Sequence, residues 1–197
     1  MVSSRSYGRG ACMDITVTCR LPLGDLASGA SVACHGICMT VVESGEKGGA
    51  SWFRVMASPE TLSKSRVESW QEGHRIHVEP SLRMGDPIGG HITYGHVDGV
   101  GMIRSVDKQS ACLRIVVALD GSLMPLMVAR GSVAVDGVSL TVVEVHKEEK
   151  SIALMVIPHT LQQTTLARLH AGDKVHIEAD MMARYLVNAL GEIRGCV

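Results

Sequence analysis

The sequence predicts a mainly β protein with two small closed barrels of about six short strands each, followed by one C-terminal helix. Three observations lead to this fold class: an internal repeat, short strands of alternating hydrophobicity, and an apolar helical stripe near the end. The repeat is clearest where VACHGICMTVVE at 32–43 returns as VAVDGVSLTVVE at 133–144, with seven of the twelve residues identical. Such self-similarity indicates a duplicated structural module.

The repeat extends along both halves of the chain in the same order. ACMDI at 11–15 matches ACLRI at 111–115, PETL at 59–62 matches PHTL at 158–161, and GHRIHVE at 73–79 matches GDKVHIE at 172–178. The five differences within the clearest segment include Cys34/Val135, His35/Asp136 and Cys38/Ser139. These differences are where two related modules could acquire distinct chemistry.

Each copy reads as short strands separated by glycine-containing turns. In the first copy the alternating segments are Met13–Cys19, Ile37–Val42, Trp52–Met56 and Arg75–Glu79. Ser58 before Pro59 predicts an N-cap followed by proline at the first position of a short helix.

The segment from 181 has helical composition, and it belongs to neither copy. Its apolar stripe contains Met182, Leu186, Ala189, Leu190 and Ile193. We therefore predict an N-terminal barrel at 1–88, a C-terminal barrel at 89–180 and a helix at 181–197 that caps the protein or joins subunits.

Composition excludes several classes of function. The net charge of -1 and the aromatic content of 3% argue against a nucleic-acid partner. The apolar runs are shorter than a membrane span, and the N-terminus lacks the apolar core of a signal peptide, which predicts a cytoplasmic protein with no membrane partner. The six cysteines form no CxxC pair, so we expect free and mostly buried thiols.

Several segments together resemble riboflavin synthase, the family with two lumazine-binding repeats. The resemblance rests on GASVACHGICMTVVE, GDPIGGHITYGHVDGVG, GSVAVDGVSLTVVEV and IPHTLQQTTLARLHAGDKVHIEAD, and on the helix that follows. It implies two six-stranded Greek-key β-barrels related by a pseudo-twofold, with a C-terminal helix that mediates trimerisation.

The N-terminus departs from this family. Members begin with a segment like MFTGI that lines the first pocket, whereas here Met1-Val2 falls opposite Met102-Ile103, so everything matching His91 to Gly101 is absent. The first barrel is therefore expected to lack its first strand, either because the natural start lies upstream or because this form is truncated.

The resemblance implies an activity that uses no metal or redox cofactor. Two molecules of 6,7-dimethyl-8-ribityllumazine exchange a four-carbon unit, giving riboflavin and 5-amino-6-ribitylamino-pyrimidinedione. One molecule binds in an N-terminal barrel and the other in the C-terminal barrel of a neighbouring subunit. The implied assembly is a homotrimer, and lumazine synthase is a further expected partner.

Residue-by-residue matches to the family give the candidate site. The shared Gly-x-x-x-Thr frame, Gly36/Thr40 and Gly137/Thr141, would be a wall of each pocket. The candidate catalytic residues are Cys38, His96, Ser139 and Asp180. The candidate substrate-binding residues are Cys38, Met39, Thr40, Met56, Ala57, Ser58, Pro59, Glu60, Thr61, Gly95, His96, Val97, Arg130, Ser139, Leu140, Thr141, Val156, Ile157, Pro158, His159, Thr160 and Leu161.

Alternative interpretations stay open for several of these residues. Asp180 could simply cap the last helix, and His91, on the opposite strand face from His96, reads as structural or as the pocket edge. His74, His77 and His176 are interpreted as surface-strand residues.

Two other classes of function compete with the synthase. One is a non-catalytic lumazine- or flavin-binding protein. The other is a metal enzyme that uses His91, His96 and Asp98, although an extended strand would not bring these three side chains together.

Overall fold

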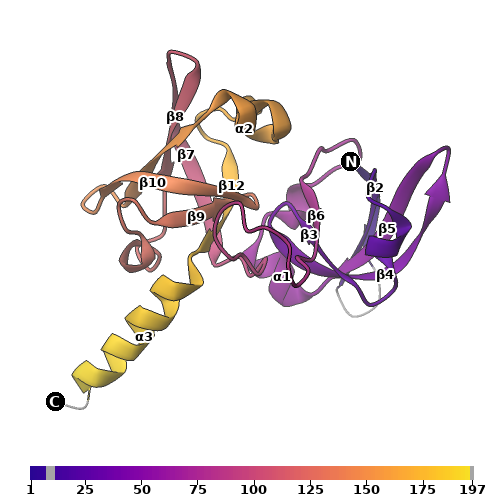
Figure 1. Ribbon diagram of the computed structural model, residues 1–197, viewed down its shortest axis with the longest axis horizontal. Helices are drawn as coiled ribbons and strands as arrows, with labels where there is room; N and C mark the ends of the chain where they lie inside the picture. The colour runs from indigo at the N-terminus through magenta and orange to yellow at the C-terminus, as the bar shows by residue number, and fades with distance from the viewer. Residues whose placement is uncertain (8–11, 196–197) are drawn as a thin grey trace. The chain divides into compact units, whose positions relative to one another are not determined.

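The computed structural model describes residues 1–7 and 12–195, and the chain divides into two compact units, Met1–Pro87 and Ile88–Val197. Each unit contains six β-strands (Figure 1). Among the described residues, no helix is long and apolar enough to cross a membrane. The mainly β class with tandem six-stranded units and a C-terminal helix is confirmed.

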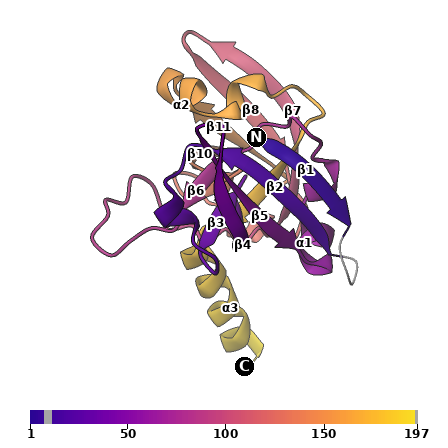
Figure 2. The same cartoon turned by 90° about the vertical axis from the view of Figure 1, so that its right-hand side faces the viewer.

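The second unit is a closed barrel with strand order β10-β11-β8-β7-β12-β9. Its elements are β7 (Gly99–Gln109), β8 (Cys112–Ala118), η4 (Met124–Leu126), β9 (Ser132–Val135), β10 (Val138–His146), β11 (Ser151–Val156), α2 (Pro158–Gln163), η5 (Thr165–Arg168), β12 (Lys174–Ala179) and α3 (Met181–Gly195). Figure 2 shows α3 extending away from the barrel of its own unit, which it touches at η4.

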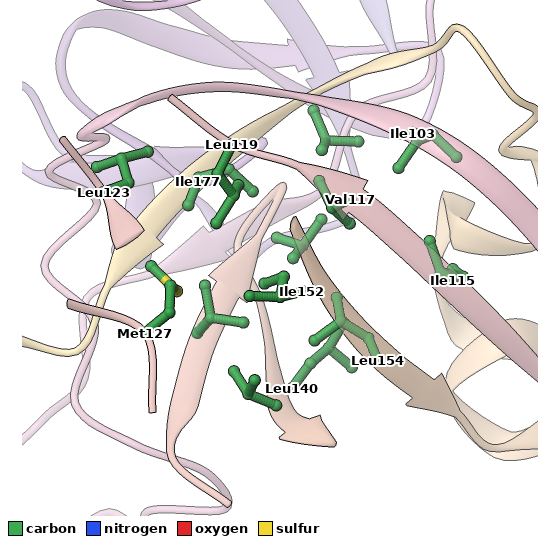
Figure 3. Packing of buried hydrophobic residues seen from close by; sticks show 14 of the residues in the cluster. Ile103, Ile115, Val117, Leu119, Leu123, Met127, Leu140, Ile152, Leu154 and Ile177 are labelled. Atoms are coloured by element: carbon green, nitrogen blue, oxygen red, sulfur yellow. The ribbon is translucent and has the colours of Figure 1, made fainter. Parts of the chain in front are cut away.

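Apolar side chains from the strands of this barrel meet in its interior. Figure 3 shows Ile103, Ile115, Ile152, Leu154 and Ile177 converging from four different strands. Each is almost fully buried. Burying a side chain of this size contributes roughly 1.5–3 kcal/mol. The barrel is therefore a packed core, and a ligand must bind outside it.

The first unit repeats the same order of elements. They are β1 (Val2–Tyr7), β2 (Met13–Cys19), η2 (Leu23–Leu26), β3 (Ser31–Cys34), β4 (Ile37–Lys47), β5 (Ala50–Ala57), α1 (Pro59–Lys64), η3 (Val67–Ser69) and β6 (Val78–Pro80). Ser58 accepts a hydrogen bond from the Thr61 N–H and Pro59 opens α1, so the predicted N-cap is confirmed.

The strands of the first unit pair as an open sheet in the order β1-β2-β5-β4-β3-β6. A closed barrel was expected for this unit, as for the second. In the second unit, Gly99–Met102 of β7 pair with β12 and close the ring. The first unit has no described residues that correspond to this stretch. A shortened first strand is nevertheless present as β1.

Backbone hydrogen bonds identify Val2 as the counterpart of Ile103. The Val2 N–H donates to His74 O at 2.9 Å, and the Gly73 N–H donates to Val2 O at 3.0 Å. Ile103 makes the same two bonds with Asp173 and Gly172, each at 2.8 Å. The predicted alignment of Met1-Val2 with Met102-Ile103 therefore holds at Val2.

Candidate active site

Two tight hairpins place the repeated Gly-x-x-x-Thr frame in the same way in each unit. His35-Gly36 joins β3 to β4 and Asp136-Gly137 joins β9 to β10, with Cys34 paired to Ile37 and Val135 to Val138. All four turn residues have φ between 49° and 85°. This is the geometry of a type I′ turn, in which glycine at the second position avoids strain. The identical turns fix Cys38 opposite Ala33 and Ser139 opposite Ala134.

The strand after each turn displays its polar residues outward. Cys38 and Thr40 are exposed on β4, and Ser139 and Thr141 are exposed on β10. The intervening Met39 and Leu140, predicted as substrate-binding residues, are buried, so only their backbone groups could meet a ligand. Thiol and hydroxyl groups therefore lie on an accessible face of each hairpin.

His35 and Asp136 differ in chemistry but have the same structural role. Both side chains are buried, and each accepts a backbone N–H at or just before the last strand of its own unit. His77 N donates to His35 Nδ1 at 3.1 Å, and His176 N donates to Asp136 Oδ1 at 2.8 Å. Cys38/Ser139 is the exposed difference between the hairpins, and it is the one that can face a substrate.

The segment before β7 reaches back to the second hairpin. His91 Nδ1 lies 2.7 Å from Ser139 Oγ, and a Cβ atom on Gly90 would come within 2.5 Å of the same oxygen. Residues 91–98 lie outside any strand, so the expected strand faces do not apply, but the structure places His91 beside the candidate pocket residue. The buried His91 Nε2 has no hydrogen-bond partner among the described residues.

His96 is held at a turn by a buried carboxylate. Glu178, at 5% exposure, accepts the backbone N–H groups of Tyr94 at 2.8 Å and Gly95 at 3.0 Å. Gly95 has φ +72°, which favours glycine. The exposed His96 ring stacks on the Tyr94 ring with centroids 5.7 Å apart. The imidazole is thus open to solvent on a well-anchored backbone.

Asp98 and Asp180 lie at the two ends of an adjoining network. Asp98 Oδ2 accepts the Ala179 N–H at 2.8 Å and Arg184 Nη2 at 2.9 Å. Asp180 Oδ1 accepts the Met182 N–H at 2.9 Å, which confirms its predicted role as the cap of α3. Its catalytic role stays a prediction.

The short helices place further predicted binding residues at corresponding positions. Ser58 Oγ and Thr61 Oγ1 lie 3.1 Å apart at the start of α1, whereas α2 begins after Ile157, which has no capping side chain. The side chains of Ala57 and Val156 are buried in the cores. The remaining predicted residues of these turns are exposed or half-buried: Met56, Pro59, Glu60, Pro158, His159, Thr160 and Leu161. Val97 is half-buried after His96.

Arg130 adopts a backbone conformation that favours glycine. Its φ is 67°, and its N–H donates to Val142 O at 2.8 Å. Gly29 makes the same bond with Val41 at 2.8 Å with φ 87°. A left-handed conformation costs an ordinary residue roughly 1–2 kcal/mol. An exposed guanidinium at a strained position supports the prediction that Arg130 serves binding.

Two expectations about histidine and cysteine need correction. His176 is buried at 1% exposure, so the surface interpretation was wrong for it, because β12 is covered on both faces. The described cysteines are free, but of Cys12, Cys19, Cys34, Cys38 and Cys112 only Cys34 is buried and Cys38 is exposed. Cys196 lies outside the described residues. Burial raises the pKa of Cys34 to about 12, so this thiol is unreactive.

Within residues 1–7 and 12–195, no three His, Cys, Asp or Glu side chains form a group that could hold a metal ion.

Sequence reasoning missed Glu178, although GHRIHVE and GDKVHIE show it as the repeat partner of Glu79. The signal for its function is its burial together with two backbone donors, and neither is visible in the sequence.

The fold and the two hairpins define the class of the protein. The family model described as Lumazine binding domain matches residues 3–81 and again 94–180. The crystal structure of LumP complexed with 6,7-dimethyl-8-(1'-D-ribityl) lumazine is similar in fold, with a TM-score of 0.73, 16% identity, and coverage of 91% of this chain and 93% of that one.

Curated relatives narrow this class to one enzyme family. A riboflavin synthase from Brucella abortus (strain 2308) is 45% identical over 158 residues, which cover 80% of this chain and 77% of that protein. The riboflavin synthase of Bacillus subtilis (strain 168) is 33% identical over 181 residues, covering 92% of this chain and 81% of the relative. The chain belongs to the riboflavin synthase family.

Proposed function

We propose that the chain catalyses the dismutation of two molecules of 6,7-dimethyl-8-ribityllumazine. A four-carbon unit passes from one molecule to the other, giving one riboflavin and one 5-amino-6-ribitylamino-pyrimidinedione. Atoms and electrons balance within the pair of substrates, so the reaction consumes no oxidant, reductant or metal. Membership of the riboflavin synthase family supports this assignment.

The repeated hairpin is the feature of this chain's own structure that best supports the proposal. The same type I′ hairpin occurs twice, and each copy exposes one reactive group and one threonine, Cys38 with Thr40 and Ser139 with Thr141. Two identical substrates require two related sites, which a duplicated module provides. Threonine hydroxyls and hairpin backbone groups can hydrogen-bond the edge of a pteridine ring.

The chemistry needs close approach of the two rings and the transfer of protons. Holding two reactants in contact removes much of the entropic barrier to their reaction. A methyl proton of one lumazine must be removed, and His96 is suited to this because imidazole titrates near neutral pH. In this proposal Cys38 and Ser139 act beside the reacting rings, Arg130 contacts substrate, and Asp180 lies at the site's edge.

The experiment compares the two hairpins directly. Cys38→Ala and Ser139→Ala are each assayed for riboflavin formation beside Cys112→Ala, a half-buried thiol in β8 that serves as the matched control. We expect a rate loss of about 10² or more at either hairpin, the range of a positioned proton-transfer group, and little change in the control. Full activity in both hairpin variants would overturn the assignment.

We also propose a homotrimer that forms through α3. This helix exposes Met182, Tyr185, Leu186 and Leu190, each more than half accessible to solvent within the chain. Soluble proteins rarely leave such a surface uncovered. Sedimentation should give a trimer for the wild type and monomers for Leu186→Glu, whereas a monomeric wild type would contradict the proposal. The cytoplasmic location stays a prediction from the sequence, and the association with lumazine synthase stays a prediction from the family.

A further inference from the structure

Two acidic side chains connect the segment that carries His96 to the end of β12. Glu178 accepts the N–H groups of Tyr94 and Gly95, at 2.8 and 3.0 Å. In the opposite direction, Asp98 accepts the N–H of Ala179 at 2.8 Å. We call Glu178 and Asp98 the carboxylate clamp. The residues that the clamp ties to β12 flank His96 in the sequence: Tyr94 and Gly95 come before it, and Asp98 comes after it.

The clamp fixes a piece of backbone that has no strand or helix of its own. Residues 91–98 precede β7 and lie outside any strand. The Asp98 N–H donates to the backbone, to Ile177 O at 2.8 Å, whereas the Tyr94 and Gly95 N–H groups donate to the Glu178 side chain. Hydrogen bonds from N–H groups to a carboxylate are stronger than those to neutral acceptors. The buried Glu178 therefore holds Tyr94 and Gly95 in one conformation, and the Tyr94 ring in turn stacks against His96.

We propose that the carboxylate clamp is a positioning device for His96, with Glu178 as its principal residue. This inference rests on the proposed function, in which His96 transfers a proton. Glu178 does not touch the reacting atoms in this account. It acts by keeping the imidazole in the orientation that the reaction needs.

The first unit supplies an internal control for this role. Glu79 occupies the repeat position of Glu178 in the matching GHRIHVE segment, but it is exposed on β6. The described part of the first unit contains no counterpart of residues 94–98 for Glu79 to hold. Within the described parts of the two units, the carboxylate at this position is thus coupled to a histidine-bearing turn in the second unit and not in the first.

The other member of the clamp extends the connection to the C-terminal helix. Asp98 Oδ2 also accepts Arg184 Nη2 at 2.9 Å, from the first turns of α3. Arg184 N–H donates to Asp180 O at 3.2 Å, within the capped start of the same helix. The turn that carries His96 is therefore anchored to α3 as well as to β12.

The test uses Glu178→Gln, which keeps the side chain's size but replaces one acceptor oxygen with a donor facing an N–H group. We expect kcat to fall about 10- to 100-fold, the scale of a misplaced catalytic group, with KM changed much less. The control Glu79→Gln should retain wild-type kcat and KM. Thermal unfolding of both variants reports any general loss of stability.

The deciding comparison is made in a His96→Gln background. If Glu178 acts through His96, the double variant Glu178→Gln/His96→Gln is no slower than His96→Gln alone. An equal rate loss in both backgrounds, or wild-type kcat in Glu178→Gln, overturns the inference. Should Glu178→Gln fail to fold, Glu178→Asp, which is one methylene shorter, decides by the same comparison.

Failure of the inference can be told from failure of the proposed function. If the wild type forms no riboflavin, or if His96→Gln matches the wild type, the role given to His96 is wrong whatever Glu178 does. A readout independent of activity is the NMR signal of the His96 ring at one fixed pH. We expect its chemical shift to move in Glu178→Gln and to stay unchanged in Glu79→Gln.

Discussion

His91 Nδ1 lies 2.7 Å from Ser139 Oγ, so the segment before β7 contacts the second hairpin. Ser139 occupies the repeat position that Cys38 occupies in the first hairpin. The contact is made outside the repeated framework, because the first unit has no described counterpart of His91. It gives Ser139 a hydrogen-bonding partner that Cys38 does not have among the residues the structure describes. The two hairpins, alike in backbone, therefore differ in their chemical surroundings.

The first prediction concerns this pair. His91→Ala should lower kcat about 10-fold, since one hydrogen bond contributes about 0.5–1.5 kcal/mol and each 1.36 kcal/mol is tenfold in rate. The double variant His91→Ala/Ser139→Ala should be no slower than Ser139→Ala. His170→Ala, an exposed histidine before β12, is the control. Strictly additive losses in the double variant would show that the pair does not act together.

A second prediction concerns the close approach of Gly90 to Ser139. An added Cβ would lie 2.5 Å from Ser139 Oγ and 2.7 Å from its Cβ, so Gly90→Ala must displace the segment. We expect weaker lumazine binding and a loss of about 1–3 kcal/mol in unfolding free energy. Gly89→Ala, which meets no atom within 4 Å, should resemble the wild type in fluorescence titration and thermal melts. Equal behaviour of the two variants would contradict the close contact.

Cysteine labelling gives a third prediction. Exposed Cys38 should react with iodoacetamide in the native protein at pH 8, whereas Cys34 should not, because burial raises its pKa to about 12 and excludes the reagent. Peptide mass mapping assigns the labelled positions. Saturating lumazine should protect Cys38 selectively. Rapid labelling of Cys34 in the folded chain would refute the burial argument.

Arg130 provides a fourth prediction. Arg130→Asn should raise KM about 10-fold, through loss of a charged contact with substrate. It should not lower the melting temperature, since asparagine tolerates the positive φ of this position better than most residues. Arg168→Asn, at an exposed position in η5, is the control for charge. An unchanged KM in Arg130→Asn would remove Arg130 from the binding site.

Much of this architecture could be predicted from the repeat and from strand alternation. The bounds Met13–Cys19 of β2 were predicted from alternation alone, because one face of that strand is buried and the other is not. β4 runs on to Lys47, past the predicted end at Val42, since its pairing with β5 continues beyond the apolar residues. Strand propensity alone does not predict how far the pairing between two strands extends.

The site was less predictable, for a physical reason. Cys38 and Ser139 were found because they are one of the differences between the two repeated hairpins and because both match pocket residues of the family. Glu178 and the His91 contact depend on tertiary burial and on a segment without regular structure, which no periodicity describes. Met39 and Leu140 were predicted as substrate-binding residues, but their side chains are buried. A match to a motif does not by itself indicate whether a side chain points into the core or toward solvent.

In the proposed reaction this chain converts two identical lumazines into two different products. Product stoichiometry tests this with 6,7-dimethyl-8-ribityllumazine as sole substrate and with chromatography following all three compounds. We expect one riboflavin and one pyrimidinedione for every two lumazines consumed, with no added cofactor. Binding of lumazine without any riboflavin formation would contradict it and leave a lumazine-binding protein in its place.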